Sequence, residues 1–283
     1  MKLGRILIPL YQDPLDYQLL EAAQQLMAQG QSCLQVAYCR TEPVDELMLG
    51  ADIAASAGLV VDALEQESQR AASCIQLRLR DWIGQHGYSL VREQIPAAAG
   101  QVSFVERVGL PAAELTRLGR VSDLILCLKP NEENSSSTPI FDSIATTGRP
   151  VLAVPLNGAS DLLQHVLIAW DGSLVASRMI SQILPVLAVA KRVSIFCYPE
   201  SDCDADSAHS LAQYLAVHNI TALNVHVRRS KPIGEALADA ASAEDAGLVA
   251  MGAYSHSRPR QFFLGGLTRH MLEKTNLALL MAH

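Results

Sequence analysis

The stretch over 252–270 holds the residues whose types and spacing are best suited to bind a ligand. It begins with Gly252, directly after an apolar run, and ends with Gly265 and Gly266 before a predicted helix over 268–274. Glycines at a helix start let backbone N–H groups approach an anion, and the helix dipole favours negative charge there. Its arginines are Arg258, Arg260 and Arg269. This pattern indicates a site for a phosphate-bearing ligand; the alternative is a solvated loop whose arginines pair with nearby acids.

A second group with suitable chemistry is Asp171, Gly172 and Ser173, which follows the apolar run at 166–170. A carboxylate at a strand tip can accept hydrogen bonds from a ribose hydroxyl or an adenine amine. The alternative is a helix N-cap, because Asp and Ser are preferred cap residues. One residue could serve both purposes.

Residues dedicated to catalysis are hard to find. The sequence has no Walker A run, no Gly-x-Gly-x-x-Gly, no Gly-x-Ser-x-Gly and no His-Glu-x-x-His. The six cysteines are scattered without a Cys-x-x-Cys pair, which predicts free, mostly buried thiols rather than metal ligands. We therefore expect a binding protein with no metal site of its own.

Short aliphatic runs alternate with amphipathic helical stretches along all 283 residues. The predicted strands of the first half are 6–10, 33–38, 102–107, 124–128 and 151–154, and those of the second are 166–170, 193–198, 222–227, 248–252 and 278–282. The predicted helices include 17–29, 57–83, 112–120, 175–191 and 234–243. Near-continuous aliphatic runs suit parallel strands that are buried on both faces. The pattern predicts an α/β protein with two tandem open parallel five-stranded sheets and helices on both faces of each.

The two halves repeat each other in order and in detail. Pro111 and Glu114 precede the fourth strand of the first half, as Pro232 and Glu235 precede that of the second. The first strands lie 160 positions apart but the prolines only 121, so the first half holds about 39 additional residues. A turn-rich stretch marks the boundary, which predicts domains over 1–158 and 159–283.

On these residues the chain resembles the universal stress protein family in its tandem form, an adenine nucleotide alpha hydrolase-like fold. The family's nucleotide-binding members carry Gly, two residues, Gly, nine residues, then Gly and Ser or Thr. Here the spacing is kept by Gly252, Ser255, Gly265 and Gly266, and Asp171 matches the family's strand-one aspartate. The resemblance implies that the second half binds ATP or AMP, with or without magnesium, as a stress-response sensor with at most slow ATP hydrolysis. The implied binding residues are Asp171, Gly172, Ser173, Gly252, Ser255, Arg258, Gly265, Gly266, Leu267, Thr268 and Arg269.

Two departures from the family pattern bear on affinity. Ser255 replaces the second glycine, and its Cβ would strain a positive φ. Gly266 replaces the hydroxyl residue, although its amide remains and Thr268 lies two residues on. Because a hydrogen bond to a charged partner contributes roughly 1.5–3 kcal/mol, its loss could weaken ATP binding tenfold or more.

The first half lacks the nucleotide-binding motif of the second half. Tyr11 stands where Asp171 stands, and the stretch after its fourth strand (129–138) has two glutamates and no glycine. We expect a degenerate partner that does not bind nucleotide in the family manner. The alternative is that Lys129 and the following serines hold a different anion.

The charge of the chain excludes some classes of binding partner. A net charge of −7 argues against nucleic acid and against anionic membranes as partners. No apolar run reaches membrane-spanning length, and the N-terminus lacks an apolar signal core, so the cytoplasm is the expected location. The last strands of the halves (151–154 and 278–282) are expected to pair and form an intramolecular pseudo-dimer, which would cover their edges.

The sequence leaves open whether two chains form a homodimer. It also leaves two alternative functions open: a nucleotide-free scaffold for a protein partner, or a binder of another small phosphorylated ligand.

Overall fold

The structure of the chain is a computed structural model. It describes residues 3–11, 17–29, 32–40, 57–92, 98–109, 111–130, 143, 146–159, 161–198, 205–226, 231–253 and 266–283. Over these ranges no helix combines the length and the apolar composition that a membrane span requires.

Strands and helices alternate through most of both halves, as the sequence predicts. The first half contains β1 (Arg5–Tyr11), α1 (Tyr17–Met27), β2 (Cys33–Arg40), α3 (Ala57–His86), β3 (Ser89–Val91), β4 (Gln101–Val108), α4 (Pro111–Gly119), β5 (Leu124–Leu128) and β6 (Val151–Val154). The second contains β7 (His165–Trp170), α6 (Leu174–Leu187), β8 (Arg192–Cys197), α7 (Ala205–Val217), β9 (Ala222–His226), α8 (Ile233–Ala243), β10 (Leu248–Gly252), α9 (Gly266–Lys274) and β11 (Ala278–Ala282). Helix α6 ends four residues before its predicted end, because 186–190 form a tighter turn into β8.

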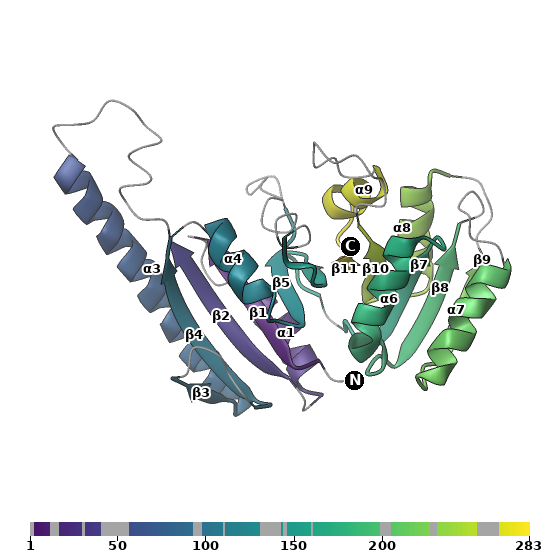
Figure 1. Cartoon of the computed structure of the whole chain (residues 1–283), viewed down its shortest axis with the longest axis horizontal. Coiled ribbons are helices and arrows are strands. Elements are labelled where there is room, and N and C mark those ends of the chain that lie inside the picture. Colours follow the sequence, from purple (N-terminus) through teal and green to yellow (C-terminus); the bar gives the residue numbers. More distant parts are fainter. Residues whose placement is uncertain are drawn as a thin grey trace.

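All of these strands join one sheet, which runs without a break through both halves (Figure 1). Its order is β3-β4-β2-β1-β5-β6-β11-β10-β7-β8-β9. Neighbouring strands are parallel within each half, and the halves meet at the antiparallel pair of β6 and β11. The predicted pairing of 151–154 with 278–282 is therefore present. The two predicted sheets are continuous, and the first gains the short edge strand β3.

Both faces of the sheet are covered by helices. In β1, the consecutive residues Ile6, Leu7 and Ile8 are fully buried, and they alternate between two hydrophobic cores. One core includes residues of α1, α3, α6 and α7, and the other includes residues of α4, α8 and α9. Burial of consecutive strand residues on opposite faces explains why the strands read as unbroken aliphatic runs.

The internal repeat extends to the register of the strands. Ile6 pairs with Leu124 in the first half, and Val166 pairs with Leu248 in the second. Counting along the strands makes Lys129 equivalent to Ala253. The backbone hydrogen bonds of these two residues are also equivalent. Lys129 N–H donates to Val154 O and Ala253 N–H donates to Ala282 O, both at 2.8 Å.

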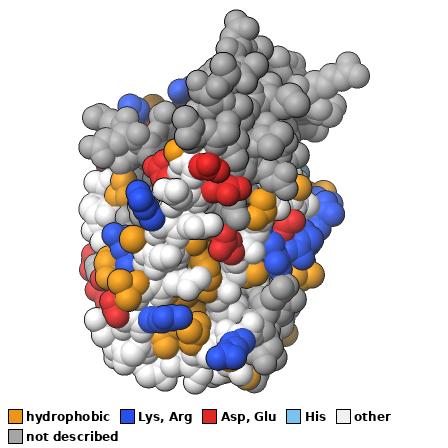
Figure 2. Space-filling view, turned by 90° about the vertical axis from the view of Figure 1, so that its left-hand side faces the viewer, with side chains coloured by type: hydrophobic (Ala, Val, Ile, Leu, Met, Phe, Trp, Pro, Cys, Tyr) orange, Lys and Arg blue, Asp and Glu red, His pale blue; other side chains and the backbone are white. Residues whose placement is uncertain are grey.

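Helix α3 accounts for much of the additional length of the first half, as predicted. It has 30 residues, and it packs on the sheet through its C-terminal half, where Ala72, Ile75, Leu79 and Trp82 are buried. Figure 2 shows this end of the molecule, where basic, acidic and hydrophobic side chains are interspersed over the described surface.

The cysteines follow their prediction with one exception. Cys33, Cys39 and Cys127 are buried free thiols, and Cys74 is an exposed one. Burial raises the pKa of Cys39 to about 11 and that of Cys127 to about 12, so both stay protonated and unreactive. The prediction is wrong for Cys197, which is disulfide-bonded. Cys197 is the last residue of β8 and is partly buried, although it packs against the core. Cys203 lies outside the described residues.

Candidate functional site

The candidate site lies at the carboxyl ends of β7 and β10. From β7 the chain continues to β8 and β9 on one side, and then returns to β10 on the other side. Strand order therefore reverses between β7 and β10, which is where open parallel sheets bind ligands. Asp171 is the first residue after β7 and Gly252 is the last residue of β10. Ala169 pairs with Met251, so the two strand ends lie side by side.

The turn at 171–173 connects β7 to α6. Asp171 Oδ1 accepts a hydrogen bond from Ser173 N–H at 2.9 Å, and Ser173 Oγ accepts one from Ala176 N–H at 3.1 Å. Gly172 has a φ of +73°, a conformation that favours glycine. The N-cap of α6 is thus Ser173 and not Asp171. Asp171 is partly exposed beside this cap, and its carboxylate is oriented by the turn.

Gly252 is needed for close packing against the start of α6. A Cβ at this position would lie 3.1 Å from Val175 Cγ1 and 3.3 Å from Ala176 N. The structure therefore brings Gly252 and the 171–173 turn together at the first turn of α6. This is a packing reason for the glycine that does not depend on a ligand.

Helix α9 carries four further residues of the predicted motif. It begins at Gly266, two residues before the predicted start. Gly266 is exposed with open space around its Cα, Leu267 packs on the core, and Thr268 is buried. Arg269 points along its own helix, because its Nε donates to both carboxylate oxygens of Glu273 at 3.1 Å.

The middle of α9 packs against α8. His270 lies against Gly234 of α8, where an added Cβ would meet the imidazole at 2.8 Å. The remaining predicted residues, Ser255, Arg258 and Gly265, lie outside the described residues, as do His256 and Arg260.

The equivalent position in the first half is occupied differently. Tyr11 ends β1, and Lys129 follows β5. Lys129 Nζ donates to the backbone oxygens of Met271 and Thr275 at 2.7 Å and of Leu277 at 3.1 Å. These partners belong to the second half. Their number argues against the alternative that Lys129 holds an anion, because its N–H groups are used.

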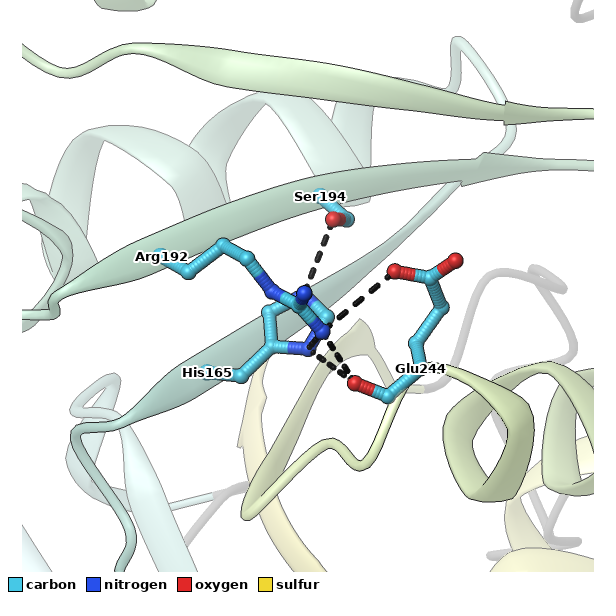
Figure 3. Close-up of polar contacts among 4 residues, drawn as sticks. All are labelled: His165, Arg192, Ser194 and Glu244. Atoms are coloured by element: carbon cyan, nitrogen blue, oxygen red, sulfur yellow. Dashed lines mark hydrogen bonds and ion pairs between the residues drawn. The ribbon is translucent and has the colours of Figure 1, made fainter.

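A polar cluster that the sequence does not predict lies at the amino ends of β7 and β8, opposite the candidate site (Figure 3). His165 and Arg192 are the first residues of β7 and β8, and Glu244 follows α8. His165 Nε2 lies 2.8 Å from Ser194 Oγ, and its Nδ1 lies 2.7 Å from Glu244 O. Arg192 contacts His165 Nδ1, the Glu244 backbone oxygen and, at 3.5 Å, the Glu244 carboxylate.

This cluster fixes the C-terminus of α8 and keeps His165 neutral. Burial lowers the pKa of His165, and the neighbouring Arg192 guanidinium lowers it further, while contacts with Glu244 act in the opposite direction. A cation at a helix C-terminus is favourable, because the last carbonyl groups carry partial negative charge. Since the cluster lies at the amino ends of the strands, away from Asp171 and Gly252, its role is structural. The local sequence gives no signal for it, because its residues come from separate elements.

Comparisons with known proteins bear on the fold. No family model and no curated protein sequence matches the chain. A universal stress protein from Archaeoglobus fulgidus DSM 4304 superposes with a TM-score of 0.72 at 13% identity, covering 100% of this chain and 98% of that one. A proposed universal stress protein from Pseudomonas aeruginosa UCBPP-PA14 gives a TM-score of 0.56 at 15% identity, with 99% and 93% covered. A protein of unknown function from Pseudomonas aeruginosa PAO1 gives 0.56 at 14% identity, with 99% and 92% covered. Over its whole length, the chain therefore has the fold of the universal stress proteins, which confirms the resemblance seen in its sequence.

Proposed function

We propose that the second half of this chain binds an adenine nucleotide, ATP or AMP, and that the protein acts as a cytoplasmic stress-response sensor. The observation that carries the proposal is the meeting of Asp171 and Gly252 at the ends of β7 and β10. Strand order reverses between these two strands, and open parallel sheets bind ligands at such a reversal. The first half has Tyr11 and Lys129 in the equivalent places, so a single site per chain is proposed.

In this proposal Asp171 holds the adenosine end of the ligand. Its Oδ1 already accepts the Ser173 N–H, which fixes the carboxylate, and Oδ2 accepts from a ribose hydroxyl. Gly172 and Ser173 shape the turn that presents this carboxylate. A turn that is held before the ligand arrives reduces the ordering cost of binding.

The phosphates would be held by the motif and by the start of α9. Gly252, Ser255, Gly265 and Gly266 would form the cradle, and the N-terminal amides of α9, including that of Leu267, would face the negative charge. Arg258, Thr268 and Arg269 are weaker contacts. Arg269 would have to leave Glu273, which is a small cost of about 0.3–0.5 kcal/mol for an exposed pair at this spacing. Magnesium, where present, would be carried mainly by the phosphates.

The first experiment is to denature the protein as purified, without added nucleotide, and to identify the released small molecules by liquid chromatography and mass spectrometry. Near-stoichiometric ATP, ADP or AMP would support the proposal. An empty result calls for calorimetric titration with ATP and magnesium, and the absence of heat there would contradict the proposal and favour a nucleotide-free scaffold.

The variant that tests the assigned site is Asp171→Ala, with Asp206→Ala as the matched control. Asp206 is an exposed aspartate in the first turn of α7, so its loss changes the net charge of the same half equally. Asp171→Ala should weaken ATP and adenosine binding about tenfold or more, since a hydrogen bond to a charged group is lost. Asp206→Ala should change neither. If the protein binds no adenosine and Asp171→Ala leaves phosphate binding mostly intact, the ligand is another phosphorylated molecule.

A further inference from the structure

Lys129 is a buried cation that joins the two halves of the chain. It is the first residue beyond β5, and only 5% of it is exposed. Its Nζ reaches across to the C-terminus of α9, and the bonded residues are 142 to 148 positions away in the sequence. Besides three backbone oxygens, it also contacts Thr275 Oγ1 at 3.3 Å.

One of these contacts satisfies a carbonyl group that α9 itself leaves without a partner. The last four carbonyl groups of a helix have no partner within it, and Met271 is the first of those four in α9. Met271 O accepts from both Lys129 Nζ and Thr275 Oγ1, each at 2.7 Å. Burial lowers the pKa of Lys129 to about 7, whereas the carbonyl oxygens around it favour the charged form. A positive charge here also complements the negative end of the α9 dipole.

The second half makes no equivalent contact with the first through the residue that corresponds to Lys129. Ala253 occupies the position in the second half that is equivalent to Lys129, and alanine has no group to donate. The half without the nucleotide motif therefore supplies a clamp to the half that has it. Since α9 is a single helix of nine residues, fixing its C-terminus also fixes its N-terminus, where the proposed phosphate site lies.

We propose that Lys129 is a positioning residue, through which the first half holds α9 in place for phosphate binding in the second half. This inference rests on the proposed function for its effect on affinity. It gives the first half a role in the site of the second, although the first half lacks the ligand-binding residues itself. It also explains why a lysine follows β5 where the repeat has a small residue.

The test compares Lys129→Met with Lys274→Met. Methionine keeps the length and apolar stem of lysine but removes the charge and the donors. Lys274 is exposed in the last turn of α9, so its substitution removes an equal charge near the same helix end and leaves the Lys129 contacts in place. For each variant, calorimetry gives the affinities for ATP and for adenosine, and hydrogen exchange with mass spectrometry follows the amides of 266–275. Lys129→Gln, which removes the charge but keeps an amide N–H₂ donor, replaces Lys129→Met if the latter does not fold.

We expect Lys129→Met to weaken ATP binding about three- to tenfold, within the range of helix-terminus charge effects, and to change adenosine binding less than twofold. Exchange along α9 should accelerate in Lys129→Met and not in Lys274→Met. Equal losses for ATP and adenosine would overturn the inference, because they would show a general rather than a phosphate-end effect. Unchanged exchange along α9 would also overturn it. If the wild type binds neither ligand, the proposed function fails, and the exchange data alone decide whether Lys129 holds α9.

Discussion

Leu152 and Leu280 face each other across the only antiparallel strand pair among the described strands, and they occupy equivalent positions in the two halves. The equivalence follows from the register, because Val151 pairs with Ile125 as Leu279 pairs with Val249. The pseudo-twofold axis that relates the halves therefore passes through this pair of leucines. Both side chains are buried in the core that contacts α1, α3, α6 and α7.

This pair predicts non-additive losses of stability. Leu152→Ala and Leu280→Ala should each lower the free energy of unfolding by about 2–5 kcal/mol, because each leaves a cavity in a packed core. The double variant should lose less than the sum, since contacting residues share the cavity. Urea unfolding measures these values. Leu215→Ala on α7 provides the control, and its loss should add fully to that of Leu280→Ala. Strict additivity within the leucine pair would contradict a contact across the axis.

Two glycines should respond in opposite ways to alanine. At Gly247, an added Cβ would lie 2.2 Å from Asp161 O, a backbone atom that cannot easily move. Gly247→Ala should therefore destabilise the protein by about 1–3 kcal/mol. Gly84 lies in α3 with nothing within 4 Å of a Cβ, so Gly84→Ala should stabilise the protein by roughly 0.5–1 kcal/mol. Thermal unfolding of both variants checks the signs, and a neutral Gly247→Ala would mean that the 161–162 turn can yield.

His165 predicts a loss of stability in mild acid. Its pKa is lowered in the folded state by burial, despite the opposing effects of Glu244 and Asp245, whereas the unfolded chain has an ordinary pKa of about 6.5. Below that pH the unfolded state binds a proton that the folded state does not, so stability falls as the pH falls. The slope cannot exceed about 1.4 kcal/mol per pH unit for one group.

The measurement is urea unfolding at pH 7.5 and at pH 5.0, for the wild type and for His165→Gln. Glutamine retains a polar side chain but does not titrate. The wild type should lose more stability between these pH values than the variant. Equal losses in both proteins would show that His165 is not the group responsible.

Gly266→Ser is expected to raise ATP affinity. Serine restores the hydroxyl that the family motif carries, and a Cβ at this exposed position meets nothing within 4 Å. One added hydrogen bond to a phosphate could strengthen binding by about tenfold or more. Calorimetry with ATP and with adenosine should show the gain for ATP only. A gain for both, or for neither, would argue against phosphate binding at the start of α9.

The sequence by itself determined the elements, their order and the repeat. Strands such as β1 and β7 are recognisable because burial on both faces requires an unbroken run of aliphatic residues, and such a run lies within one short segment of the sequence. The turn of Asp171, Gly172 and Ser173 was likewise predictable, because caps and tight turns depend on residues close in sequence. The choice between Asp171 and Ser173 as the N-cap was not, since both residue types serve equally well.

Only the tertiary structure decided the partners of buried polar groups. The sequence leaves Lys129 open as a possible anion ligand, but its acceptors lie in and just after α9, more than 140 residues away. The cluster of His165, Arg192 and Glu244 likewise combines the starts of two strands with the end of a helix. The sequence does not predict the edge strand β3, because a strand of three mostly exposed residues shows no hydrophobic pattern. Lys129 and the His165 cluster share one physical reason. A hydrophobic pattern shows whether a residue is buried, whereas the partner of a hydrogen bond depends on which element packs beside the residue.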